Sequence, residues 1–239
     1  MKFYKVPDGF LRDDDKLDRK IKYDFKSTFL SLNVPINQPT LIELFKTTQK
    51  EAAVIKERGE GRAWTYPPES LHFSLAGILV KEDDLNSWQI KDVVEKKMGK
   101  VKDIVKKEIN KIEPFFIQPR FMRSTADSIF IYCSFPLTDK IRNLQETLVK
   151  NIGELFNSLE VCAYYSKNKK EGAPINIARW LFSTRGEVDD LLEGISEKPF
   201  KEINLDYKNL KVEEVALTYS DQFWSNPGEN IIKKFTLSK

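Results

Sequence analysis

The sequence of 239 residues contains a single histidine, and this scarcity limits the chemistry that the chain can perform. A mechanism that needs two imidazoles, one as acid and one as base, cannot run within this chain. The one histidine lies in Leu71-His72-Phe73-Ser74-Leu75, whose alternation predicts a half-buried strand. His72, Ser74 and Ala76 would then share its polar face, where an imidazole and a hydroxyl can meet one ligand.

Cysteine, glycine and an excess of one charge are also scarce. Two cysteines, Cys133 and Cys162, are too few for a disulfide framework. We interpret them as buried free thiols, from which a cytoplasmic location is expected. With ten glycines there is no glycine-rich phosphate loop, and no set of side chains has metal-ligand spacing, so no metal or other cofactor is expected. The net charge of +3 is weak support for a dedicated nucleic-acid binder.

Long hydrophobic runs are lacking too. No uncharged run reaches 18 residues, and the N-terminus opens no apolar signal segment, so no membrane association is expected. Hydrophobic residues make up 41% of the chain and charged residues 31%, which is typical of a globular protein. The length suits one large domain or two small lobes, and no pattern predicts the oligomeric state.

Predicted strands and helices alternate in the same order in each half of the chain. Residues 1–26 are charged and weakly patterned, and we interpret them as an N-terminal extension of a domain at 27–239. Strands are expected at 27–34, 70–80, 115–120, 128–135, 174–183, 211–219 and 231–237. Helices are expected at 37–59 (where Thr40 and Glu43 have capping-box spacing), 83–112, 138–156 and after Gly186, with a loop at 59–68. This order predicts an α+β, bilobal fold: two related lobes, each with an antiparallel sheet and outer helices, and a groove between them.

The segment from Trp64 to Leu75 (WTYPPESLHFSL) resembles a motif of the two-histidine phosphoesterases, the superfamily of cyclic phosphodiesterases and RNA 2′,5′-ligases. Supporting pieces follow in order along residues 27–237: Phe115, 174–179, 212–217 and the terminal turn and strand. Members of this family use two His-x-Thr/Ser motifs, one per lobe, whose imidazoles move protons while the hydroxyls hold the phosphate. The resemblance implies that His72 and Ser74 are the catalytic residues of the first motif.

The second motif of the family would fall on Pro174-Ile175-Asn176-Ile177-Ala178-Arg179. The Ala-Arg pair fits, but Pro174 and Asn176 stand where the histidine and the hydroxyl residue are expected, and neither side chain transfers a proton. The resemblance therefore implies a degenerate active site with weak or altered catalysis on a nucleotide or RNA end, such as a 2′,3′-cyclic phosphate or a 2′,5′ linkage. The alternatives are a non-catalytic module that binds nucleotide or RNA in the same groove, and a scaffold whose groove is vestigial.

Four further residues are candidate substrate contacts. Asn176 can hydrogen-bond a phosphate or a base edge, and Tyr66 and Tyr219 can stack on a nucleobase. Simple alternation puts Arg179 on the strand face opposite Asn176, which favours a rim or structural role. Core packing is the alternative for both tyrosines. Basic residues in loops near the groove are candidates to attract phosphate: Arg62, Lys167, Lys169 and Lys170.

Overall fold

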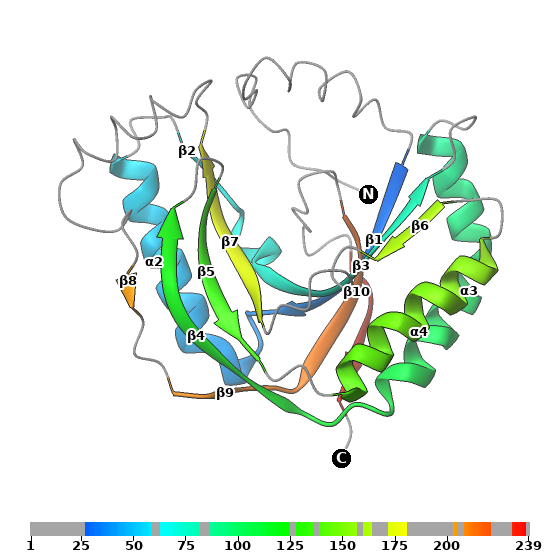
Figure 1. The fold of residues 1–239 in the computed structure, drawn as a ribbon. Helices are drawn as coiled ribbons and strands as arrows, with labels where there is room; N and C mark the ends of the chain where they lie inside the picture. The colour runs from blue at the N-terminus through cyan, green and yellow to red at the C-terminus, as the bar shows by residue number, and fades with distance from the viewer. Residues whose placement is uncertain are drawn as a thin grey trace.

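The computed structural model describes residues 27–58, 63–81, 87–124, 128–135, 139–156, 160–163, 172–180, 203–204, 208–220 and 231–237. The predicted extension at 1–26, the helix after Gly186 and the four basic loop residues lie outside these ranges. Two antiparallel sheets, here named sheet A and sheet B, form the two lobes (Figure 1). No helix of the described residues is long and apolar enough to cross a membrane.

Sheet A has five strands in the order β11-β10-β1-β3-β6. Their bounds are β1 Ser27–Pro35, β3 His72–Lys81, β6 Glu160–Ala163, β10 Glu214–Ser220 and β11 Ile231–Thr236. Helices α3 (Ser87–Ile109) and α4 (Asp139–Leu155) lie along the outer side of this sheet (Figure 1). The apolar stripe of α4 is buried, as the sequence predicts, and Gln145 of α4 donates to the Leu75 carbonyl at 2.6 Å.

Sheet B has the strand order β2-β7-β5-β4-β8, with β9 pairing separately with β4. Their bounds are β2 Ala63–Thr65, β4 Phe115–Ser124, β5 Ser128–Ser134, β7 Gly172–Trp180, β8 Ile203–Asn204 and β9 Leu210–Val212. Helix α2 (Ile42–Arg58) covers the outer face of β2 and β7. The helices of both lobes therefore lie outside, and the inner faces of the two sheets face each other (Figure 1).

The predicted α+β bilobal architecture is confirmed, but the lobes do not follow the two halves of the chain. Strand β2 from the first half belongs to sheet B, whereas β6, β10 and β11 from the second half complete sheet A. Hydrophobic alternation reveals which face of a strand is buried, but it carries no information about which strand lies beside it.

Several predicted boundaries were wrong in instructive ways. Part of the predicted loop at 59–68 is strand β2, because its backbone pairs with β7. The first helix begins with the 3-10 turn Pro39–Leu41, in which Thr40 donates to Gln38 and does not act as the predicted cap. Strand β4 continues past residue 120 to Ser124, with a register shift after Pro119. In each case pairing with a distant strand or a proline decided the boundary.

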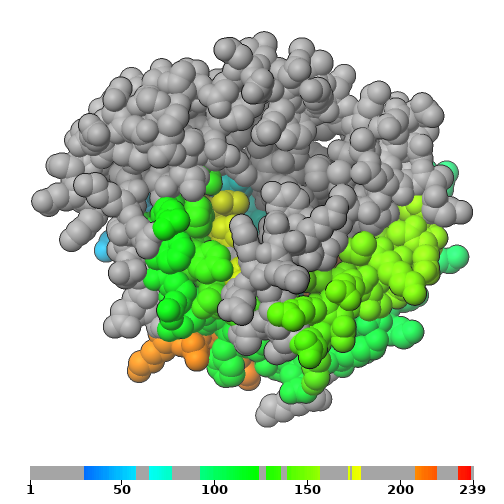
Figure 2. All heavy atoms as spheres, viewed as in Figure 1, coloured from blue at the N-terminus to red at the C-terminus, as the bar shows by residue number. Residues whose placement is uncertain are grey.

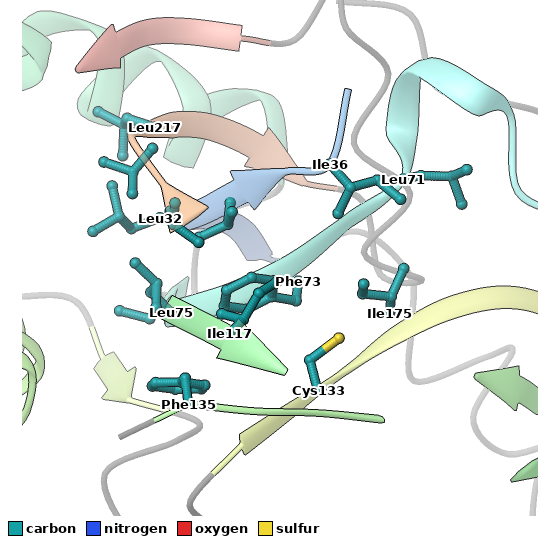
Figure 3. Close-up of a cluster of buried hydrophobic side chains, with 14 of the residues drawn as sticks. Leu32, Ile36, Leu71, Phe73, Leu75, Ile117, Cys133, Phe135, Ile175 and Leu217 are labelled. Atoms are coloured by element: carbon teal, nitrogen blue, oxygen red, sulfur yellow. The ribbon is translucent and has the colours of Figure 1, made fainter. Parts of the chain in front are cut away.

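The apolar core joins the two sheets beneath their inner faces (Figure 3). Phe73 of β3 packs on Phe135, with ring centroids 5.8 Å apart, and Phe115 meets the same ring at 6.0 Å. Cys133 and Ile175 from sheet B complete this cluster (Figure 3). Cys133 is the buried free thiol that was predicted, and burial raises the pKa of this thiol. The shared core holds β3 and β7 close together.

Candidate functional site

Strand β3 carries His72 and Ser74 on the inner face of sheet A. Its neighbour β1 pairs Pro35 with His72 and Asn33 with Ser74. The opposite face of β1 carries Leu30 and packs toward the helices. His72 is half-buried, and Ser74 is 7% exposed. The imidazole and the hydroxyl therefore share one face, as the alternation of the sequence predicts.

The proton distribution of His72 is set by a single backbone contact. Its Nδ1 lies 2.5 Å from the carbonyl oxygen of Ser70. Because a carbonyl can only accept, the Nδ1 atom carries the hydrogen and the lone pair of the neutral ring lies on Nε2. Burial lowers the pKa of His72 from 6.5 to about 4, against the smaller, opposite effect of this hydrogen bond. At neutral pH the ring is therefore uncharged, so its Nε2 can accept a proton, as a weak base, but has no proton to donate.

A short turn before β3 holds the Ser70 carbonyl in place. The 3-10 turn Pro68–Ser70 follows Pro67, whose carbonyl accepts both the Ser70 amide (2.9 Å) and the Ser70 hydroxyl (2.7 Å). The Tyr66 amide donates to Ile177 of β7 at 2.9 Å. The proline pair in the sequence thus produces a rigid turn that orients the imidazole and ties it to the other lobe.

A β-bulge follows Ser74. The register of β1 and β3 passes from Asn33–Ser74 to Leu32–Ala76 and leaves Leu75 unpaired. The prediction that Ala76 shares the face of His72 and Ser74 is therefore wrong, because the extra residue moves Ala76 beside the helix-facing Leu32.

Strand β7 has a bulge at the equivalent place. The register of β5 and β7 passes from Phe130–Asn176 to Ile129–Ala178 and leaves Ile177 unpaired. Counted from the two bulges, Pro174 and Asn176 occupy in β7 the positions that His72 and Ser74 occupy in β3. Because a bulge follows the same position in both strands, the backbone supports the alignment of the two motifs, whatever side chains they carry. Asn176 is half-buried.

The β7 bulge also changes the expectation for Arg179. Register pairs position 179 with Ser128, two residues from the Phe130 that pairs with Asn176. Residues two apart on β5 share a face, so positions 176 and 179 fall on the same face of sheet B. The predicted opposite placement was wrong, because simple alternation does not count the residue inserted at the bulge.

The two candidate tyrosines are not brought to this site. Tyr66 is 4% exposed and belongs to the apolar core. Tyr219 pairs with Leu30, which puts it on the helix side of sheet A, opposite His72. Burial and the negative charge of Glu95 raise the pKa of Tyr219, so its hydroxyl stays protonated. The structure favours the alternative of core packing for both rings.

A buried polar cluster beside Ser74 was missed by the sequence reasoning. Asn33 Nδ2 donates to Ser31 Oγ at 3.0 Å and to Thr218 Oγ1 at 2.8 Å. Its Oδ1 is buried without a hydrogen-bond partner among the described residues. The cluster makes the inner wall of sheet A small and polar. The polar alternation of Ser31 and Asn33 in the first strand was the available signal.

No group of three or more His, Cys, Asp or Glu side chains in the described ranges could hold a metal ion. Among the described side chains, β3 contributes one base (His72) and one hydroxyl (Ser74) to the site, and β7 contributes one amide (Asn176). This set suits hydrogen bonding to a phosphate and removal of one proton.

No protein-family model and no curated protein matches the sequence. Solved structures do match. The crystal structure of TT0787 of Thermus thermophilus superposes with a TM-score of 0.54 at 15% identity, covering 87% of this chain and 97% of that one. That structure has the fold of the two-histidine phosphoesterase superfamily. The chain has the two-histidine phosphoesterase fold.

Two further matches are structures of E. coli LigT. The apo form has a TM-score of 0.48 at 10% identity, and the complex with 3′-AMP has 0.44 at 11%; both cover 89% of this chain and 99% of that one. The two-histidine phosphoesterase fold was expected from the segment at 64–75, and its presence confirms that resemblance at the level of the fold.

Proposed function

We propose that this chain binds the phosphate of a nucleotide or RNA end between β3 and β7 and turns it over slowly, as a phosphodiesterase-like protein. The 2.5 Å contact between His72 Nδ1 and the Ser70 carbonyl carries this proposal. It makes Nε2 the basic nitrogen on the same inner face as Ser74, and the lowered pKa keeps that nitrogen unprotonated at neutral pH.

The supported reaction is hydrolysis of a 2′,3′-cyclic phosphate. His72 Nε2 takes a proton from water as the water oxygen bonds to phosphorus, and Ser74 and Asn176 donate to phosphate oxygens. One ring P–O bond breaks, its electron pair stays on the ribose oxygen, and that oxygen takes a proton from solvent. The last step lacks a positioned acid, because Pro174 and Asn176 have none to offer. A missing proton-transfer group costs about 10²–10⁴-fold in rate.

The lack of a positioned acid at Pro174 and Asn176 favours a second candidate, a module that binds the nucleotide or RNA end without cleaving it. Asn176 is a donor and acceptor but not an acid, which suits recognition as well as turnover. In this case the affinity for the phosphate ligand survives His72→Ala with a modest loss, and no product forms.

Incubation with 2′,3′-cyclic nucleotides and 2′,5′-linked dinucleotides, followed by product analysis, separates the two candidates. Slow product formation that disappears in His72→Gln and falls in Ser74→Ala supports the phosphodiesterase. Binding without product supports the module. If no phosphate ligand binds or raises the melting temperature, both fail and the groove is vestigial.

A further inference from the structure

The inner face of sheet B is aromatic and cationic, unlike the polar inner face of sheet A. Along β5, buried residues alternate with half-buried ones, and the half-buried set includes Phe130 and Tyr132. Register adds Phe121, opposite Tyr132, and Arg123, opposite Phe130. These four residues are here named the aromatic face. Figure 2 shows atoms of β4, β5 and β7 (green to yellow) at the molecular surface.

Three planar groups of this face are already stacked. The rings of Phe121 and Tyr132 have centroids 5.1 Å apart and planes 9° from parallel. The Arg123 guanidinium lies 5.1 Å from the centroid of Phe121. Phe121 is half-buried and Arg123 is exposed, so this stack is not sealed in the core. Preorganised planar groups lose little entropy when another planar group is added.

Gly172 of β7 leaves the space in which the Tyr132 ring lies. A Cβ atom at this position would stand 2.6 Å from the tyrosine oxygen and 2.7 Å from Cζ, and it would also collide with the Cys133 carbonyl. Any other residue would displace the ring or the strand. The ring is therefore held against β7, on the face that also carries Pro174 and Asn176.

The two walls match different parts of one ligand. Sheet A presents the His72 imidazole and the Ser74 hydroxyl, which can hydrogen-bond phosphate and ribose. Sheet B presents aromatic rings, of which Phe121 and Tyr132 cover one face of each other and Phe130 lies half-buried beside them. Nucleobases stack on aromatic faces, and the exposed cations of Arg120 and Arg123 lie on β4 of this sheet. Flat rings next to arginine suit bases linked by phosphates better than aliphatic protein side chains.

We propose that the aromatic face binds single-stranded RNA, so that the chain recognises the end of a strand in preference to a lone nucleotide. This inference rests on the proposed function for the position of the strand's terminal phosphate at His72 and Ser74. Preceding nucleotides then stack across β7, β5 and β4, with Arg123 near their phosphates. No covalent step is added to the proposed reaction.

Fluorescence anisotropy with a labelled single-stranded RNA of about six nucleotides tests this binding. One probe ends in a 2′,3′-cyclic phosphate and a second ends in a 3′-hydroxyl; a 2′,3′-cyclic mononucleotide serves as competitor. The expected result is that the cyclic-ended RNA binds at least about tenfold more tightly than the mononucleotide, since each stacked base contributes further affinity.

Matched variants locate the binding surface. Phe121→Leu should weaken binding of the RNA about tenfold while leaving that of the mononucleotide unchanged. Phe116→Leu is its control, since Phe116 is an exposed phenylalanine on the same strand outside the stack. Arg123→Gln should make the negative slope of log affinity against log salt shallower by about 0.7. Arg142→Gln, on the exposed side of α4, should leave that slope unchanged.

Each outcome distinguishes this inference from the proposed function. If the RNA binds no more tightly than the mononucleotide, or if Phe121→Leu and Arg123→Gln bind it as the wild type does, the aromatic face is not an RNA site, and the proposed function is unaffected. If both RNA probes bind equally and His72→Gln has no effect, RNA binding by the aromatic face is supported. Binding of the terminal phosphate at His72 and Ser74 is then contradicted. Arg123 is exposed, so its variant remains informative should Phe121→Leu fail to fold.

Discussion

At the scale of single residues, His72 has a proton affinity that its surroundings control. The folded chain holds its pKa at about 4, whereas the unfolded chain has the ordinary value of 6.5. The unfolded state therefore binds more protons between these values. Stability is full above pH 6.5 and is lost as the pH falls toward 4, by about 1–3 kcal/mol for a half-buried ring.

Because His72 is the only histidine, its titration can be observed without assignment. We expect the one imidazole signal in NMR to titrate near pH 4, and denaturation to show the stability loss between pH 6.5 and 4. In His72→Gln this part of the pH dependence should vanish. An imidazole pKa near 6.5 in the folded protein would contradict the burial of the ring.

Tyr219 offers a second test at this scale. Its hydroxyl is buried without a hydrogen-bond partner among the described residues, which is a cost to the folded state. We expect Tyr219→Phe to leave the free energy of unfolding unchanged or to raise it by up to about 2 kcal/mol, measured by urea denaturation. Turnover should not change, since the residue lies on the helix side of sheet A. A loss of activity would return Tyr219 to the list of substrate contacts.

At the scale of elements, β3 and β7 are related by their bulges, and this relation suggests a gain-of-function experiment. Replacing Pro174 by His and Asn176 by Thr would create a second motif at the positions that match His72 and Ser74. We expect the double variant to raise turnover of a 2′,3′-cyclic nucleotide by about 10²–10⁴-fold, because it supplies the missing acid.

Asn176→Thr alone is the control for this experiment, since it adds a hydroxyl without a proton carrier. Loss of activity on subsequent His72→Gln substitution would show that the two imidazoles act together. A folded double variant with no gain in rate would mean that the two strand positions do not face one substrate.

At the scale of the whole molecule, each sheet draws strands from both halves of the chain, and a single core joins the sheets. We propose that residues 27–239 behave as one domain, and we expect urea denaturation to show one transition by both circular dichroism and tryptophan fluorescence. A fragment ending at residue 135 should not fold, because sheet A would lose β6, β10 and β11. Two separated transitions would contradict a single domain.

Much of this architecture was predictable from the sequence, because alternation and helical periodicity report which face of an element is buried. The strand of His72 and the polar face that it shares with Ser74 follow from five residues. The aromatic face was not predictable, since Phe121, Phe130 and Tyr132 look like ordinary strand residues until register places them together. Arg179 and Ala76 were misplaced because a bulge inserts one residue without leaving a mark in the alternation.

By itself, the sequence determined that only one imidazole is present, that it shares a strand face with a hydroxyl, and that the chain builds two sheets with outer helices. These are local properties, set by residue type and spacing. The tertiary structure alone decided which strands from the two halves became neighbours, which nitrogen of His72 carries the hydrogen, and which rings stack on sheet B. The strand neighbours and the ring stacking depend on contacts between residues distant in sequence, whose free energies no local pattern contains. The hydrogen on His72 depends on the direction of a carbonyl only two residues away, which the folded turn Pro68–Ser70 sets.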